Sequence, residues 1–203
     1  MHKIGLTGGI GSGKSTVAKL LEEKGAVLVN ADLLGHEVYL PGKPAYDDII
    51  ESFGRAVVAE DGTIDRKKLG PIVFSDPQKL ARLNEITHPR IAGLAQERVA
   101  ELEAADHQVA VLEAAILFEA GWESLVDEIW VTVVKPEVAA QRIADRGGLD
   151  PAQVLERIKS QMTNEERISR SDIVISTEGA LTDTAERTGD AWRALQQRLD
   201  EAS

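Results

Sequence analysis

Cysteine is absent from this sequence of 203 residues, and so are long apolar runs without charge. Without cysteine the chain forms no disulfides and offers no thiolate ligands to a metal. No apolar stretch approaches the ~20 residues of a membrane helix, because Glu113 and Glu119 interrupt the longest one. The apolar segment before the first glycine cluster, Ile-Gly-Leu, is too short for the core of a secretory signal. We therefore expect a soluble cytoplasmic protein with no membrane partner.

Basic residues are scarce as well. The chain has 23 Lys and Arg against 34 Asp and Glu, and its formal net charge is −11. Such an acidic chain is a poor general binder of nucleic acid, so we expect no nucleic-acid partner. The length suits one domain with room for a small inserted subdomain.

Apolar segments with β-branched residues alternate with segments of helical periodicity. This alternation predicts an α/β fold with a five-stranded parallel sheet flanked by helices. Residues from about 36 to 107 carry almost no strand signal, so we expect this stretch to be mostly helical. The expected strands lie within residues 2–7, 26–32, 107–118, 127–134 and 171–176, and the expected helices within 14–25, 76–86, 89–105, 136–147, 150–162 and 180–199.

A glycine-rich segment between the first expected strand and helix has the spacing G-x-x-x-x-G-K-[ST]. We call residues 8–15 the phosphate loop. Glycine permits positive φ, so the loop can turn several N–H groups inward, and the next helix adds its free N–H groups and positive dipole end. Lys14 would reach the β- and γ-phosphates, Ser15 would hold Mg²⁺ and Thr16 would touch the α-phosphate. The expected nucleotide-binding residues are Gly9, Gly11, Ser12, Gly13, Lys14, Ser15 and Thr16.

A phosphate loop leaves several classes of protein open: a small-molecule kinase, a GTPase switch or an ATP-driven mechanical protein. Asp32-Leu33-Leu34-Gly35 matches the Asp-x-x-Gly of GTPases, but four-residue matches are common by chance. The sequence contains no Asn-Lys-x-Asp, so guanine readout has no visible basis. Mechanical ATPases usually have longer chains.

The ordered series of motifs resembles the dephospho-coenzyme A kinase family along almost the whole chain. The segments that carry this resemblance are IGLTGGIGSGKSTVAKLLEEKGAVLVNAD, LPGKPAYDDIIESFG, DGTIDRKKLGPIVFSD, LNEITHPRI, EAAILFEAG and RIKSQMTNEERISRSDIVIS. Three positions depart from the family pattern. Asn30 stands where the family has Asp, Ala115 stands where it has Pro, and Ser176-Thr177-Glu178-Gly179 replaces an Asn-rich turn near the adenine.

The resemblance implies a P-loop kinase that transfers the γ-phosphoryl group of ATP to the ribose 3′-hydroxyl of dephospho-coenzyme A. Asp32 would be the catalytic acid that orients the acceptor hydroxyl, although Asp is also favoured as a helix N-cap. Lys14 would be a catalytic cation. Glu113 would act on Mg²⁺ through water, or would be a solvated strand end.

Two arginines four residues apart share one helical face before Gly147-Gly148. Arg142 and Arg146 therefore fit a lid that closes over ATP, with Arg142 as a catalytic cation and Arg146 as a ligand of ATP. The alternative is a surface helix with two exposed arginines.

The acceptor would bind to the helical stretch. His88 and Arg90, which we expect just before a helix, would contact its phosphate or ribose, and Arg66 with Lys67 and Lys68 would face its pyrophosphate. A groove for the pantetheine arm would be lined by Leu69, Ile72, Val73 and Phe74. A structural histidine, a solvated charge cluster and ordinary core packing are the respective alternatives.

We thus expect a single domain that acts on ATP and dephospho-coenzyme A as a monomer or small homo-oligomer. Another nucleotide or small-molecule kinase, or a nucleotide-binding switch without catalysis, stays open as an alternative. The expected parts are a core (about 1–35, 108–136 and 166–203), a helical acceptor-binding insert (about 36–107) and a lid (about 137–165).

Overall fold

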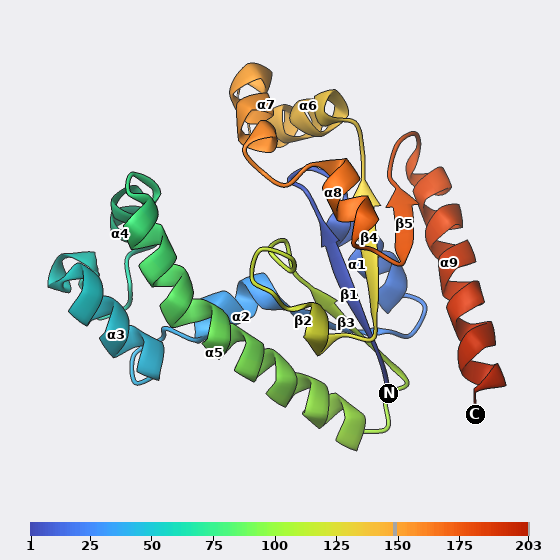
Figure 1. The fold of residues 1–203 in the computed structure, drawn as a ribbon, viewed down its shortest axis with the longest axis horizontal. Helices are drawn as coiled ribbons and strands as arrows, with labels where there is room; N and C mark the ends of the chain where they lie inside the picture. The colour runs from blue at the N-terminus through green and yellow to red at the C-terminus, as the bar shows by residue number, and fades with distance from the viewer. Residues whose placement is uncertain (148–149, 203) are drawn as a thin grey trace. The chain divides into compact units, whose positions relative to one another are not determined.

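Five strands form one sheet among the residues that the computed structural model describes, 1–147 and 150–202 (Figure 1). The strand order is β2-β3-β1-β4-β5, and the pairs β1/β3, β1/β4 and β4/β5 are parallel. The five-stranded parallel sheet expected from the sequence is confirmed. The strands are β1 (His2–Gly8), β2 (Val27–Asn30), β3 (Val109–Glu113), β4 (Glu128–Val133) and β5 (Ile173–Ser176).

The central position of β1 places the phosphate loop where the strand order reverses. The chain moves from β1 to β2 on one side, and later from β3 across β1 to β4 on the other side. Ligands of open α/β sheets bind beyond the carboxyl ends of the strands at such a switch point. The pairing Leu6↔Glu113 and Gly8↔Thr132 brings the ends of both neighbouring strands to the start of the loop.

The chain divides into two compact units, Met1–Val29 with Leu102–Ser203, and Asn30–Glu101. In the first unit, α1 and α9 pack on each other, and apolar side chains of α1 and α9 form one buried cluster with side chains of the sheet. Trp130 is the largest fully buried side chain of this core. The helices of this unit are α1 (Lys14–Glu22), α6 (Pro136–Gly147), α7 (Pro151–Lys159), α8 (Asn164–Ser169) and α9 (Leu181–Glu201), with a 3-10 turn η2 (Glu123–Leu125).

The second unit is helical, with only an isolated bridge between Val58 and Ile64 among its described residues. Its own core gathers around Ile49, Val57 and Val73. The elements are α2 (Ala31–Glu37), α3 (Pro44–Phe53), α4 (Arg66–Phe74), α5 (Pro77–Ala104) and a 3-10 turn η1 (Arg55–Val57).

The expectation of two helices, within 76–86 and 89–105, is wrong, because α5 continues through Pro89. Proline normally ends a helix, since it lacks an N–H and disfavours helical geometry in the residue before it. Here Thr87 donates its hydroxyl to the carbonyl of Leu83 at 2.9 Å, and Arg90 donates to the carbonyl of Ile86 at 2.5 Å. These bonds go to the carbonyls of Leu83 and Ile86, whereas the carbonyl that loses its helical donor to Pro89 is that of Glu85.

Two helices, α6 and α7, pack against each other beyond the carboxyl end of β4 (Figure 1).

A capping box stabilises the start of α8: the side chains of Thr163 and Glu166 each accept a hydrogen bond from the other residue's backbone N–H. Among the described residues, we find no helix with the length and apolar character that crossing a bilayer demands.

Candidate active site

The phosphate loop joins β1 to α1 with a backbone that only glycine adopts easily. Gly11 and Gly13 have φ values of 73° and 84°, in the left-handed region. Gly13 is also the N-cap of α1, and no side chain of the described residues caps this helix. The first turn of α1 therefore presents its N–H groups and the positive end of its dipole to the loop, as an anion site requires.

A carboxylate at the end of β3 contacts the last two side chains of the phosphate loop. Glu113 Oε1 accepts hydrogen bonds from Lys14 Nζ and from Ser15 Oγ, each at 2.9 Å. The side chains of Lys14 and Glu113 are 11% and 5% exposed. The solvated strand end considered for Glu113 is therefore wrong, because the sheet buries this carboxylate beside the loop.

Ser12 anchors the phosphate loop to its neighbours through both its side chain and its backbone. Its hydroxyl is buried and lies 2.7 Å from the hydroxyl of Thr132 on β4. The Ser12 carbonyl accepts a hydrogen bond from Thr177 Oγ1 at 2.8 Å. The hydroxyl and the carbonyl of Ser12 thus fix the path of the loop between β4 and the segment after β5.

One cavity, of about 190 Å³, lies on the β5 side of the loop. We call it the β5-side cavity. It contains the expected lid arginines and Thr16. Its lining residues are Gly11, Gly13, Thr16, Arg142, Arg146, Thr177, Gly179, Leu181 and Thr184.

Arg142 is held within this cavity by Thr177. Its Nη1 donates to Thr177 Oγ1 at 3.0 Å, and its Nη2 donates to the Thr177 carbonyl at 2.6 Å. Because Thr177 also bonds the Ser12 carbonyl, a single threonine joins α6 to the phosphate loop. Sequence reasoning noted Thr177 only as a departure from the family pattern. Thr177 lies 35 residues from Arg142 in the chain, so no local pattern in the sequence predicts the hydrogen bond between them.

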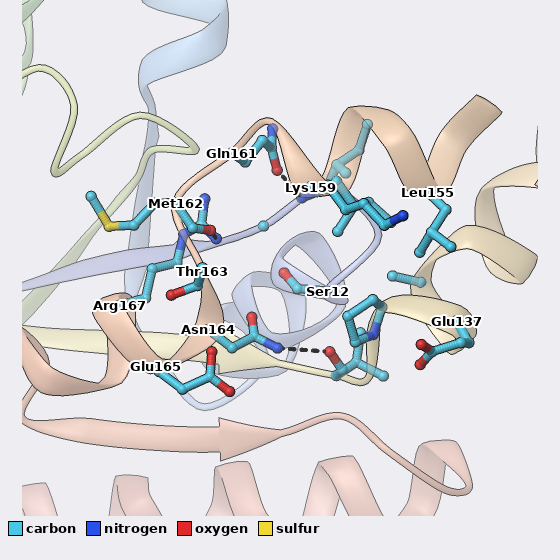
Figure 2. A pocket seen from close by; sticks show the side chains of 16 residues that line it. Ser12, Glu137, Leu155, Lys159, Gln161, Met162, Thr163, Asn164, Glu165 and Arg167 are labelled. Atoms are coloured by element: carbon cyan, nitrogen blue, oxygen red, sulfur yellow. Dashed lines mark hydrogen bonds between the residues drawn. The ribbon is translucent and has the colours of Figure 1, made fainter. Parts of the chain in front are cut away.

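A second cavity, of about 340 Å³, lies on the other side of the loop (Figure 2). We call it the α8-side cavity. Gln161 Oε1 accepts the N–H of Ile10 at 3.0 Å, and Asn164 donates to the Val134 carbonyl at 2.9 Å. The loop contributes Gly9, Ile10 and Ser12. The remaining lining residues are Val134 after β4 and residues from the start of α6, from α7 and from α8 with the segment before it.

Arg167 lies in this cavity and is only 3% exposed. It donates to the Met162 carbonyl, and its Nη2 lies 3.6 Å from Glu119 Oε1. Burial lowers the pKa of Arg167, while Glu119 and Glu166 raise it. Sequence reasoning did not single out Arg167, because its segment carries several other charges and nothing local marks one of them as buried.

Asp32 belongs to the second unit, in the first turn of α2, where its side chain is exposed. The N-cap of this helix is Asn30, whose Oδ1 accepts the N–H of Leu33 at 3.0 Å. The alternative interpretation of Asp32 as a cap is therefore wrong, and the family departure at Asn30 has a structural role. The Asp32 carboxylate remains available for other chemistry.

A groove within the second unit has a volume of about 490 Å³. We call it the insert groove. Leu69, Val73 and Phe74 line it, but Leu69 and Val73 are also buried members of the core of the unit, against which Ile72 packs. Arg66 and Lys67 also line it, and Arg66 contacts the His36 ring. Phe74 is 79% exposed, so core packing does not account for it.

His88 and Arg90 were expected just before a helix, and this is wrong because both lie inside α5. Burial lowers the pKa of His88. Arg90 forms an ion pair with Asp48, which ties α5 to α3. The lid prediction also included Gly148, which lies outside the described residues; α6 ends at Gly147.

The matching family model, the curated relatives and the solved structure described here all carry the name dephospho-CoA kinase. The sequence model of a family described as dephospho-CoA kinase matches residues 2–183. A dephospho-CoA kinase of Carboxydothermus hydrogenoformans is 44% identical, over 91% of this chain and 89% of that protein. One from Geobacter sulfurreducens is 44% identical over 95% of this chain and 98% of that protein. The solved dephospho-CoA kinase of Campylobacter jejuni superposes with a TM-score of 0.72 at 25% identity, covering 96% of this chain and 97% of that one.

Proposed function

The chain belongs to the dephospho-CoA kinase family, and from this premise we propose how its residues carry out the reaction. The reaction is ATP-dependent phosphorylation of dephospho-coenzyme A, which completes coenzyme A synthesis. The γ-phosphoryl group of ATP passes to the ribose 3′-hydroxyl and leaves ADP. Such chemistry needs positioning and neutralisation of charge more than covalent catalysis.

The observation that carries the proposal is the shared contact of Lys14 and Ser15 with Glu113 Oε1, at 2.9 Å from each. This contact sets the phosphate-binding cation and the hydroxyl beside a buried acid at the carboxyl end of the sheet. Lys14 exchanges the carboxylate for β- and γ-phosphate oxygens when ATP binds. The loop N–H groups and the first turn of α1 hold the remaining phosphate charge.

Ser15 and Glu113 fit a magnesium ion. Mg²⁺ prefers oxygen ligands and is commonly bound by one or two carboxylates together with substrate phosphates and waters. The hydroxyl of Ser15 and the carboxylate of Glu113, in contact with each other, are such a donor set. Among the described residues no three His, Cys, Asp or Glu side chains gather into a metal site. The ion would neutralise charge on the phosphates.

The nucleoside of ATP occupies the β5-side cavity. Thr16 lines this cavity and is the residue assigned to the α-phosphate, to which the nucleoside is attached. Arg142 and Arg146 form one wall, where a guanidinium can stack on a base or hold a phosphate. A catalytic role for Arg142 requires it to leave Thr177 for the transferring phosphoryl group as α6 and α7 close as a lid.

The acceptor binds to the second unit. The insert groove offers apolar walls at Leu69, Val73 and Phe74 for the pantetheine arm, and cations at Arg66 and Lys67 for the diphosphate. Asp32 accepts or orients the proton of the 3′-hydroxyl. His88 and Arg90 are proposed acceptor contacts as well, although the ion pair of Arg90 with Asp48 also gives it a structural role.

Cellular context follows from the substrates. Because ATP is the phosphoryl donor, we place the reaction in the cytoplasm, catalysed by a monomer or a small homo-oligomer. All partners in the proposal are small molecules.

An acceptor panel tests the proposal. The protein, ATP and Mg²⁺ are incubated with dephospho-coenzyme A, with AMP or with shikimate, and ADP release is followed by a coupled assay. We expect acceptor-dependent turnover with dephospho-coenzyme A alone. Turnover with another acceptor would reassign the substrate, and ATP binding without turnover would indicate a switch.

A further inference from the structure

The phosphate loop has two flanks, and different cavities border them. Gly11, Gly13 and Thr16 line the β5-side cavity, whereas Gly9, Ile10 and Ser12 line the α8-side cavity. With the nucleoside in the β5-side cavity, the triphosphate runs along the loop toward the opposite flank. The γ-phosphate end therefore lies toward the flank of Gly9 and Ile10, an orientation that rests on the proposed function.

The segment between α7 and α8 is bonded directly to this flank. Gln161 accepts the Ile10 N–H at 3.0 Å. Arg167 approaches Gly9 so closely that a Cβ there would lie 3.2 Å from Arg167 Nη1. Glycine at position 9 thus leaves room for the guanidinium beside the loop backbone.

Arg167 is weakly compensated for a buried cation. Among the described residues its one ion pair joins Nη2 to Glu119 Oε1 at 3.6 Å, and the Glu119 side chain is 38% exposed. Its Nε is buried and has no hydrogen-bond partner among the described residues. Taking a charge out of water costs several kcal/mol, and one long ion pair does not recover this cost. Stability alone therefore does not explain a guanidinium at this place.

We propose that Arg167 is a positioning residue for phosphoryl transfer. It holds the 161–163 connection through the Met162 carbonyl, so that Gln161 fixes Ile10, and it sets a buried positive charge at the γ-phosphate end of the loop (Figure 2). The same connection directly follows α7. One segment therefore holds both the end of the proposed lid and residues 9 and 10 of the phosphate loop.

Three variants test this proposal: Arg167→Met, Arg167→Lys and, as a matched control, Arg170→Met. Arg170 is also paired with a glutamate, Glu123, and stacks on Phe118 at 4.4 Å, away from the loop. The measurements are kcat with ATP and dephospho-coenzyme A, the Kd values of ATP and ADP by calorimetry, and Tm.

Arg167→Met should lower kcat about 10²-fold, comparable to loss of one preorganised donor. ATP affinity should fall while ADP affinity stays within about twofold, because ADP lacks the γ-phosphate and α8 lies at the other flank from the nucleoside. Arg167→Lys keeps the positive charge but lacks the planar guanidinium with its paired donors. Its kcat should be about tenfold higher than that of Arg167→Met. Arg170→Met should leave kcat unchanged.

Two results would overturn the proposal. One is a kcat of Arg167→Met within about threefold of wild type. The other is a joint loss of kcat, ADP affinity and Tm without recovery in Arg167→Lys, which is the pattern of a purely structural residue. Should Arg167→Met not fold, Gln161→Met decides, since Gln161 is exposed. In Gln161→Met, a decrease in kcat of about tenfold with unchanged ADP affinity supports the proposal, and full activity of this variant refutes it. Wild-type protein that fails to phosphorylate dephospho-coenzyme A would instead refute the proposed function.

Discussion

Replacing Glu113 by Gln removes the carboxylate charge that Lys14 and Ser15 contact, while the shape of the side chain is kept. In the folded protein the ammonium group of Lys14, whose side chain is 11% exposed, then faces a neutral amide. The change also weakens the donor set proposed for Mg²⁺. It should therefore act on stability without nucleotide and on turnover with nucleotide.

The size of the stability effect follows from the burial of the pair. Removing one partner of a buried ion pair costs about 3–5 kcal/mol. Since Lys14 keeps some access to solvent, we take the lower end, about 3 kcal/mol, which corresponds to a decrease in Tm of about 6–12 °C for a chain of this size. Turnover should fall about 10²–10³-fold, the range found when one charge-stabilising group of an active site is lost.

The assay combines thermal unfolding with steady-state kinetics. ATP added without divalent ions should raise the Tm of Glu113→Gln more than that of wild type, because phosphate oxygens replace the missing carboxylate beside Lys14. The double variant Lys14→Met/Glu113→Gln should recover stability but not activity. Together with wild type and the single variants Lys14→Met and Glu113→Gln it forms a cycle that measures the coupling. Glu128→Gln is the control: Glu128 is also buried and is bonded to Trp130 and Arg198, but it lies at the amino end of β4, so kcat should not change.

Two outcomes would refute this reasoning. If Glu113→Gln turns over at the wild-type rate, the carboxylate of Glu113 has no role in the reaction. Equal kinetic losses in Glu113→Gln and Glu128→Gln would mean that kcat reports general destabilisation and not the site.

Further substitutions separate the remaining roles. Lys14→Ala should lower kcat about 10²-fold or more without unfolding the protein, and near-normal turnover would detach the loop from catalysis. Asp32→Asn should lower kcat while ATP affinity and Tm stay constant, whereas Asn30→Ala should cost about 1 kcal/mol of stability as a lost N-cap; the reverse pattern would make Asp32 structural. Arg142→Ala should lower kcat more than it weakens ATP binding, and equal effects would confine it to holding the nucleoside. Thr177→Val should raise the Kd of ATP roughly tenfold, through loss of a buried hydroxyl between α6 and the loop, and an unchanged Kd would make that bond incidental.

Local patterns in the sequence predicted the parts of the fold that depend on neighbouring residues. All five strands were expected from short β-branched runs, and the phosphate loop from its glycines and lysine. The strand order was not predicted, because pairing between β1 and the distant β3 and β4 depends on tertiary packing. The continuous α5 was missed because the usual rule that a proline ends a helix does not hold at Pro89.

Site residues fell into the same two groups. Lys14 and Ser15 follow from a contiguous motif. Thr177 bonds a loop that lies more than 150 residues earlier in the chain, Arg167 lies beside the same loop at Gly9, and each is an ordinary residue in its own segment. Burial distinguishes them, and periodicity cannot report the burial of a single side chain on a six-residue helix such as α8.

The central claim is that this chain moves a phosphoryl group from ATP to one hydroxyl of dephospho-coenzyme A. The most direct measurement is the mass and phosphorus NMR spectrum of the product formed from ATP, Mg²⁺ and dephospho-coenzyme A. We expect a product heavier by one phosphoryl group, with a monoester coupled to the 3′ carbon of the ribose, in equal amount to ADP. ADP with free phosphate and unchanged acceptor, or a monoester at another position, would contradict the account.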